Sequence, residues 1–176
     1  RSPAVMSDPE TQRLIAETQE IARRSSRELR TTSYLLHPPD LEEFGLIPAL
    51  RSWADGFSQR TGIELDVDLE DPGRLPLEAE TAIFRVAQEA LANMHRHSGS
   101  ATAALKLSVL RGHLHLEVSD KGRGIPPEIL AHSPSRIGVG LMGMRERTRQ
   151  LGGDLDIVSD GTGTTVRARI PRSIHS

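Results

Sequence analysis

The chain has 176 residues, of which 22 are basic and 24 acidic, so its formal net charge is only −2. This balance provides no field that would attract nucleic acid or an anionic lipid surface. Cysteine is absent, which excludes disulfides, thiol catalysis and zinc–thiolate sites and fits a reducing compartment such as the cytoplasm. No apolar run approaches the roughly 18 residues that cross a bilayer, and no signal peptide is visible at the start. We therefore expect a soluble, cytoplasmic domain, and the initial Arg1 in place of Met suggests a piece of a longer protein.

Residues 8–36 are expected to form a long helix, with Asp8 as a possible cap and Pro9 in its first turn. One narrow, partly polar stripe follows helical spacing apart from a last gap of seven: Leu14, Thr18, Ile21, Ser25, Leu29 and Leu36. Two interpretations stay open: a solvated helix that lies on the main domain, or one arm of a helical hairpin that dimerises. His37-Pro38-Pro39 should end the helix, because a residue before proline avoids helical angles.

The rest of the chain alternates helix and strand patterns. Helices are predicted at three stretches with apolar residues at helical spacing: Leu46–Arg60, Leu77–His97 and Leu141–Leu151. Strands are predicted at five stretches: Ile63–Glu70, Ala101–Leu110, His113–Ser119, Asp154–Ser159 and Thr164–Ile170. Because most strands are joined as hairpins, we expect an α+β fold with an open, mixed but mostly antiparallel sheet covered by helices on one face.

Glu89, Asn93 and Arg96 fall in one narrow polar sector of the Leu77–His97 helix. An amide oxygen suits Mg²⁺, which takes few protein ligands and fills its coordination with phosphate oxygens and water. Arg96 could hold a phosphate, and Glu89 could orient or deprotonate an attacking group. A solvated helix edge with an Arg85–Glu89 ion pair is the alternative interpretation.

The period of its strand places Asp120. Leu114 and Val118 share one face, so a period of two puts Asp120 on that same inward face. A carboxylate directed into a core needs donors, which an adenine amino group and an ordered water would supply. Gly122 and Gly124 would let a flat ring approach the backbone. An aspartate that bonds its own turn is the alternative.

The same count on the last strand identifies Thr164, whose hydroxyl leads an otherwise apolar row. A polar group in that row implies a polar partner, and Asp120 or its water is the natural candidate. A buried threonine bonded to its own sheet would explain the pattern equally well.

Gly138, Gly140 and Gly143 surround the predicted helix start near Leu141. Free amides at a helix start, with no side chains in the way, can bind phosphate oxygens. The signal is weak by itself. No βαβ unit precedes it and no Gly-Lys-Ser/Thr occurs, so neither a Rossmann nor a Walker site is expected.

Four histidines are interpreted as inert. His95 and His97 are two residues apart on a helix and point in different directions, so they cannot jointly bind a metal. His113 and His115 are expected on the outward face of their strand, at the surface.

Three stretches carry a resemblance to a known family: Leu35-Leu-His-Pro-Pro-Asp-Leu with Phe44-Gly-Leu; Phe84-Arg-Val-Ala-Gln-Glu-Ala-Leu-Ala-Asn93; and Gly140-Leu-Met-Gly-Met-Arg-Glu-Arg with Leu151-Gly-Gly. They resemble the ATP-binding domains of the Bergerat fold, shared by gyrase, heat-shock chaperones, mismatch-repair ATPases and sensor histidine kinases. More narrowly, the chain is similar to the histidine kinases that partner NarL-type response regulators. The resemblance implies a two-layer α/β sandwich that binds ATP and Mg²⁺.

The resemblance also implies residue roles. Asn93 would coordinate Mg²⁺, Glu89 would polarise the reacting group as the catalytic residue, and Asp120 would contact the adenine amine. The other implied ATP contacts are Arg96, Gly122, Gly124, Gly138, Gly140, Leu141, Gly143 and Thr164. Residues 124–138 would form a short lid over the nucleotide.

The family's phosphoacceptor histidine has no counterpart in this sequence. It lies on the first helix of a dimerising hairpin, whereas no histidine precedes His37, which matches the motif after the hairpin. Residues 1–40 are therefore expected to hold the second hairpin helix and a linker, and residues 41–176 the ATP-binding domain. Such a fragment should bind ATP but offer no place for the phosphoryl group.

The implied partners are ATP, the histidine-bearing dimerisation helix of the parent kinase, a response regulator with a receiver domain and, in the full-length protein, a second copy. Nucleic acid is not expected, and the parent protein could carry a membrane anchor. Within the same fold, an anti-sigma-factor-type protein serine kinase and a gyrase-like clamp are alternatives. A non-catalytic module for ATP binding or dimerisation is the alternative from another class.

Overall fold

A computed structural model describes residues 39–126 and 139–172 of the chain. Contacts divide the chain into two units, Arg1–Pro39 and Asp40–Ser176, and the sheet belongs entirely to the second. The helix predicted at residues 8–36, the His37 motif, Gly138 and most of the lid predicted at 124–138 lie outside the described residues.

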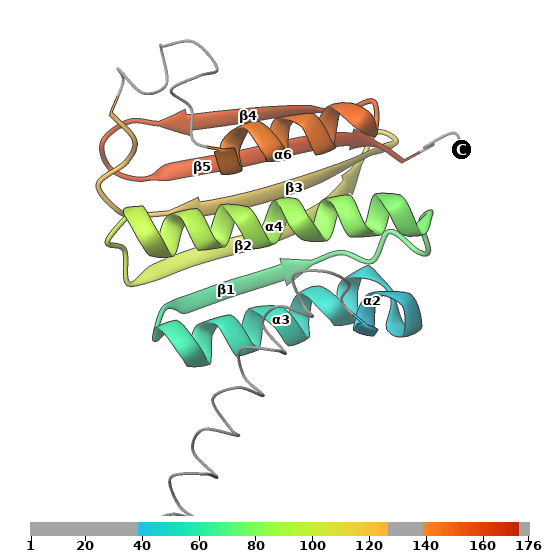
Figure 1. The fold of residues 1–176 in the computed structure, drawn as a ribbon, viewed down its shortest axis with the longest axis horizontal. Coiled ribbons are helices and arrows are strands. Elements are labelled where there is room, and N and C mark those ends of the chain that lie inside the picture. Colours follow the sequence, from blue (N-terminus) through green and yellow to red (C-terminus); the bar gives the residue numbers. More distant parts are fainter. Residues whose placement is uncertain (1–38, 127–138, 173–176) are drawn as a thin grey trace, which may run out of the picture. The chain divides into compact units, whose positions relative to one another are not determined.

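Five strands form one sheet in the order β1-β2-β3-β5-β4 (Figure 1). Their bounds are β1 Glu64–Leu69, β2 Thr102–Leu110, β3 His113–Asp120, β4 Asp154–Ser159 and β5 Thr164–Pro171. β1 runs parallel to β2, and the other neighbouring pairs are antiparallel. The β2–β3 hairpin turns at Arg111 and Gly112, whose φ values of 51° and 77° match a tight turn with two left-handed residues.

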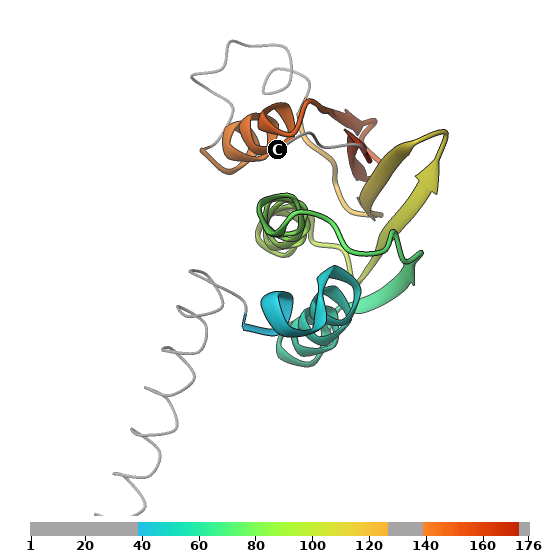
Figure 2. The same cartoon turned by 90° about the vertical axis from the view of Figure 1, so that its right-hand side faces the viewer.

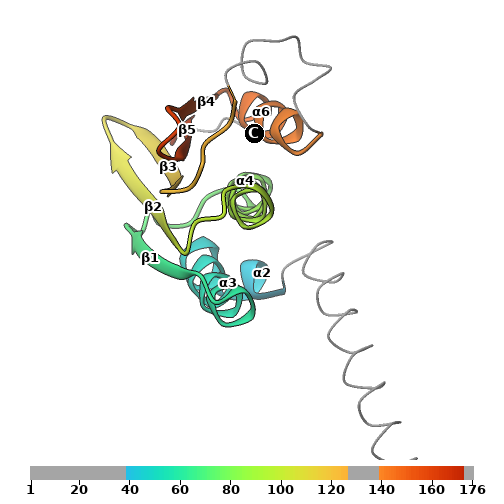
Figure 3. The same cartoon turned by 90° about the vertical axis from the view of Figure 1, so that its left-hand side faces the viewer.

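Helices cover one face of this sheet, as the two side views show (Figures 2 and 3). They are α2 Pro39–Phe44, α3 Leu46–Thr61, α4 Leu77–His97 and α6 Val139–Gln150. Gly62 ends α3 with a φ of 72°, and its amide donates to the Ser58 carbonyl at 2.8 Å.

The core lies between the sheet and the helices. Alternate residues of the strands face it, among them Leu105 and Leu107 of β2 and Leu114 and Leu116 of β3. α4 supplies ten buried side chains, so it is the central helix of the layer. The polar side chains that α4 carries beside its apolar stripe are therefore attached to a rigidly packed helix.

The predicted α+β fold, its five strands and its three helices are confirmed, with differences at the boundaries. α2 was not predicted, because Pro38-Pro39 indicated only the end of a preceding helix. Proline also suits the first position of a helix, where its missing amide hydrogen has no partner to bond. α6 begins at Val139, two residues before the predicted start.

The face of the sheet opposite the helices is charged. Arg167 Nε lies 2.7 Å from Glu117 Oε2 on the paired strand, and Arg169 Nε lies 3.0 Å from Asp154 Oδ1. Exposed pairs of this kind add little stability, so they chiefly keep this face polar. In the described part of the chain, no helix combines the length and apolar character of a membrane span.

Candidate functional site

A cavity of about 560 Å³ opens where α4 and β3 end and where β5 and α6 begin. These ends of the four elements lie at the left of Figure 1. The described residues that line it are Ala90, Asn93, Met94, His97, Ser98, Val118, Asp120, Arg123, Gly124, Ile125, Pro126, Gly140, Leu141, Thr164 and Val166. Most of this wall is apolar, with a few polar groups between. Such a slot suits a planar ring that also offers hydrogen-bond donors.

Asp120 lies on the inward face of β3, as its parity predicted, and its side chain lines the cavity. Its Oδ1 also accepts a hydrogen bond from the Gly122 amide at 2.7 Å. The turn bond and the inward position are therefore both present, and the contact with an adenine amine stays a prediction. One carboxylate oxygen fixes the turn, and the side chain remains part of the cavity wall.

Thr164 lines the cavity beside Ser159, and their hydroxyl oxygens are 3.3 Å apart. Ser159 Oγ donates to the Gly163 carbonyl at 2.8 Å and accepts from the Ile125 amide at 2.7 Å. A serine hydroxyl carries one hydrogen, so Thr164 is the donor in the Thr164–Ser159 pair. Ser159 was missed in the sequence, although it continues the inward row of Leu155 and Ile157 on β4.

Gly122 and Gly124 are required by the packing of the protein itself. A Cβ at Gly122 would lie 2.6 Å from the Ser98 Cβ and overlap the Ser98 carbonyl oxygen. At Gly124, where φ is 72°, it would lie 2.7 Å from Ser159 Oγ. Gly124 lines the cavity and Gly122 does not. The close approach of the end of α4 is therefore a reason of its own for Gly122, and the predicted room for a ring stays a prediction.

Arg96 joins the polar residues of α4 into one hydrogen-bonded group. Its Nη2 lies 3.1 Å from both Glu89 Oε1 and Asn93 Oδ1, and its Nε donates to the Ala92 carbonyl at 3.1 Å. The predicted polar sector is therefore present. Asn93 lines the cavity, whereas the side chains of Glu89 and Arg96 stand beside it.

The amide of Asn93 is only half satisfied. Its Nδ2 is buried and has no hydrogen-bond partner in the described residues. A buried amide nitrogen without a partner lowers the stability of the fold. A ligand oxygen at this position would accept its hydrogen bond. No group of three or more histidine, aspartate or glutamate side chains that could hold a metal occurs in the described ranges. A lone amide oxygen fits Mg²⁺ only if phosphate oxygens complete its shell.

The first turn of α6 contributes Gly140 and Leu141 to the cavity, while Gly143 does not reach it. A Cβ at Gly140 would overlap the carboxylate oxygen Oε1 of Glu89, so the Glu89 side chain lies directly against the backbone of α6 at this point. Glu89 is thereby held between Arg96 and the backbone of α6.

Two further lining residues were not predicted. Arg123 donates from Nε to the His97 carbonyl at 2.6 Å, and its amide donates to the Ser98 carbonyl at 3.0 Å. These contacts satisfy carbonyls at the end of α4. His97 itself lines the cavity, whereas His95 packs its ring edge-on against Phe57, so the prediction that the two do not share a metal is not contradicted.

Residues 78–174 match the family described as histidine kinase-, DNA gyrase B- and HSP90-like ATPases. The sensor histidine kinase MctS of Rhizobium johnstonii is 40% identical over 150 residues, which cover 85% of this chain and 32% of MctS. The sensor histidine kinase LiaS of Bacillus subtilis is 30% identical over 166 residues, which cover 94% of this chain and 45% of LiaS. The chain thus spans less than half the length of these relatives.

A solved structure has the same fold. The histidine kinase domain of a blue-light activated histidine kinase from Erythrobacter litoralis superposes with a TM-score of 0.64 at 29% sequence identity. The match covers 72% of this chain and 60% of that one.

Proposed function

Since the chain belongs to the family of histidine kinase-, DNA gyrase B- and HSP90-like ATPases, as the ATP-binding catalytic domain of a sensor histidine kinase, we propose that its cavity binds ATP with Mg²⁺ through α4, β3, β5 and α6. One observation carries the assignment of the site. Asp120 from β3 and Asn93 from α4 line the same cavity, with apolar walls between them.

The base of the nucleotide would occupy the end of the cavity at Asp120. A carboxylate accepts from the exocyclic amine of adenine, and Thr164 would join it through a shared water. Met94, Val118 and Val166 offer apolar contact to the two faces of the ring. The same wall would disfavour guanine, which presents a carbonyl oxygen at the amine position and would leave Asp120 without its donor.

The phosphates would lie toward Asn93 and the first turn of α6. Free amides at the start of a helix attract phosphate oxygens, and Gly140 leaves them accessible. Asn93 Oδ1 would be the protein ligand for Mg²⁺, which would neutralise phosphate charge when bound. Glu89 is the candidate to orient the attacking group, and Arg96 and Gly138 are candidate phosphate contacts.

The reaction we propose is transfer of the γ-phosphoryl group to a histidine on a dimerisation helix of the parent kinase, with release of ADP. Residues 1–40 would supply the second helix of that hairpin and a linker, and the parent would act as a dimer. A response regulator with a receiver domain would then accept the phosphoryl group. The role of the ATP-binding domain is to align donor and acceptor and to offset charge, because phosphoryl transfer requires little covalent help.

Asp120→Asn tests the site. The substitution places an amide NH₂ where the adenine amine needs an acceptor, so ATP affinity measured by calorimetry should fall by about a hundredfold or more. Asp160→Asn is the matched control. Asp160 also fixes its own turn, by accepting from the Thr162 amide at 3.0 Å, but it does not line the cavity. Unchanged affinity in Asp120→Asn, or an equal loss in Asp160→Asn, would refute the assignment.

A further inference from the structure

The hydrogen bonds that the Arg96 guanidinium makes in the described part of the chain all go to its own helix. It reaches back to the Ala92 carbonyl and sideways to Glu89 and Asn93, with all three donor–acceptor distances at 3.1 Å. The Arg96 side chain is nevertheless 54% exposed, so it is held by these bonds and not by packing. The Arg96 side chain can therefore leave these acceptors when another group binds them or offers Arg96 stronger hydrogen bonds.

Chemistry fixes which atom of Asn93 faces Arg96. A guanidinium has donors only, so the amide atom beside it must be the oxygen, Oδ1. A magnesium ion also binds the oxygen of an amide and never its NH₂. Arg96 and the metal therefore require the same atom of Asn93.

Two cations cannot share this oxygen at low cost. The guanidinium and a divalent ion would both lie within contact distance of one small atom, and like charges at that range repel strongly. The opposite edge of the amide gives no compensation, because Asn93 Nδ2 is buried and has no partner within residues 39–126 and 139–172. A phosphate oxygen next to the metal would supply that partner.

We propose that Arg96 is a positioning residue that holds Asn93 and Glu89 together in the metal-free chain and gives up Asn93 Oδ1 when ATP binds with Mg²⁺. This inference rests on the proposed function. It adds that Arg96 and the metal compete for Asn93 Oδ1, so displacing Arg96 offsets part of the free energy of metal binding. The contact with Glu89 need not break, because the metal does not require that oxygen.

A calorimetric comparison measures this opposition. ATP affinity is determined with Mg²⁺ and with EDTA. The dissociation constant in EDTA divided by the dissociation constant in Mg²⁺ gives the factor by which the metal tightens binding. Arg96→Ala removes the competitor and should raise this ratio by about tenfold, the size expected for one charge-assisted hydrogen bond. The absolute affinities are not the readout, since Arg96 can also contact phosphate.

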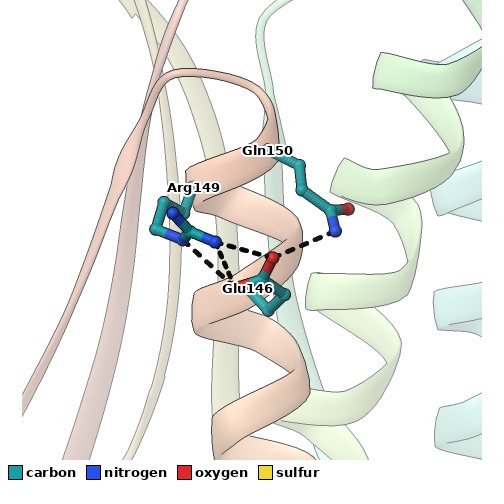
Figure 4. A network of polar contacts seen from close by, with 3 residues as sticks. All are labelled: Glu146, Arg149 and Gln150. Carbon is teal, nitrogen blue, oxygen red and sulfur yellow. Dashed lines mark hydrogen bonds and ion pairs between the residues drawn. The ribbon is translucent and has the colours of Figure 1, made fainter.

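Arg149→Ala is the matched control. Arg149 is likewise a helical arginine paired with a glutamate, at 3.0 Å from Glu146, and it does not line the cavity (Figure 4). Its removal should leave the ratio unchanged. If Arg96→Ala also leaves the ratio unchanged and weakens ATP equally in both solutions, the opposition does not exist and the inference is wrong.

A second measurement locates the competition at Asn93. NMR follows the Arg96 Nη2–H and Asn93 side-chain amide signals of the unsubstituted chain, first saturated with ADP in EDTA and then supplied with excess Mg²⁺. Both signals should shift on metal addition. If neither moves at that step, Arg96 does not yield to the metal and the inference fails. If the unsubstituted chain binds no ATP in either solution, the proposed function fails and this inference with it.

Discussion

At the residue scale, the pair of Glu146 and Arg149 shows how local contacts set a protonation equilibrium. Arg149 Nε and Nη2 reach Glu146 Oε2 at 3.1 and 3.0 Å, and Gln150 Nε2 reaches Oε1 at 3.1 Å (Figure 4). The hydrogen bonds and charge of Arg149 lower the pKa of Glu146 from its ordinary value. Both side chains are exposed, so the consequence lies in titration and hardly in stability.

Arg149→Ala should raise the pKa of Glu146 toward its ordinary value, and Gln150→Ala should raise it by less, because Arg149 provides the larger contribution. The sign follows from linkage. A carboxyl whose pKa is lowered on folding contributes stability above its unfolded pKa, and this contribution is lost as the pH falls through its folded pKa. NMR titration of the Glu146 carboxyl carbon measures both shifts. A larger rise in Gln150→Ala would contradict the ranking.

Single residues of the site were predictable where a pattern had one physical reason. Strand parity alone placed Asp120 on the cavity wall, and helical spacing placed Asn93 in a polar sector. Ser159 and Arg123 were missed, because their roles depend on segments distant in sequence. Parity applied to β4 could have found Ser159, whereas no local pattern indicates that Arg123 satisfies the end of α4.

At the element scale, the contact between α4 and α6 depends on Gly140. Alanine in a helix is more favourable than glycine by about 1 kcal/mol, so a glycine there needs a reason. At Gly140 the reason is the carboxylate of Glu89, which occupies the space of a Cβ. At Gly143 an added Cβ would meet only the mobile tip of Arg147, at 2.8 Å from Nη1.

Gly140→Ala and Gly143→Ala should therefore differ in stability. Gly143→Ala should stabilise the fold by up to about 1 kcal/mol, because the tip of Arg147 can move aside. Gly140→Ala should be less stable than Gly143→Ala by at least about 1 kcal/mol, since Glu89 must rotate out of its pair with Arg96. Urea unfolding measures both. Equal stabilities would show that the α4–α6 contact tolerates a methyl group at Gly140.

Helices and strands were predictable because their apolar periods were uninterrupted, as in α4. The start of α6 was not, since glycines around it hide the helical period. The sequence pattern also gave no indication that β1 pairs with β2 in the parallel direction. The connection between them passes through α4, and only the packing of α4 on the sheet fixes which edge β1 joins.

At the scale of the whole molecule, the described core and the described cavity lining lie within Asp40–Ser176. Because the proposed nucleotide site is held on one core, we expect it to bind ATP without the first unit. Phosphoryl transfer differs, because it also needs an acceptor in line with the γ-phosphate. Binding and transfer should therefore separate experimentally.

Supplying an acceptor in trans tests that separation. The chain is incubated with labelled ATP, Mg²⁺ and a dimerisation hairpin that carries the phosphoacceptor histidine of a sensor kinase. The hairpin should become labelled, and the label should be lost in acid and kept in base, as the P–N bond of phosphohistidine requires. Label that survives acid would instead indicate a serine kinase. Asp120→Asn should abolish the labelling and Asp160→Asn should retain it, because only Asp120 lines the cavity that would position the nucleotide.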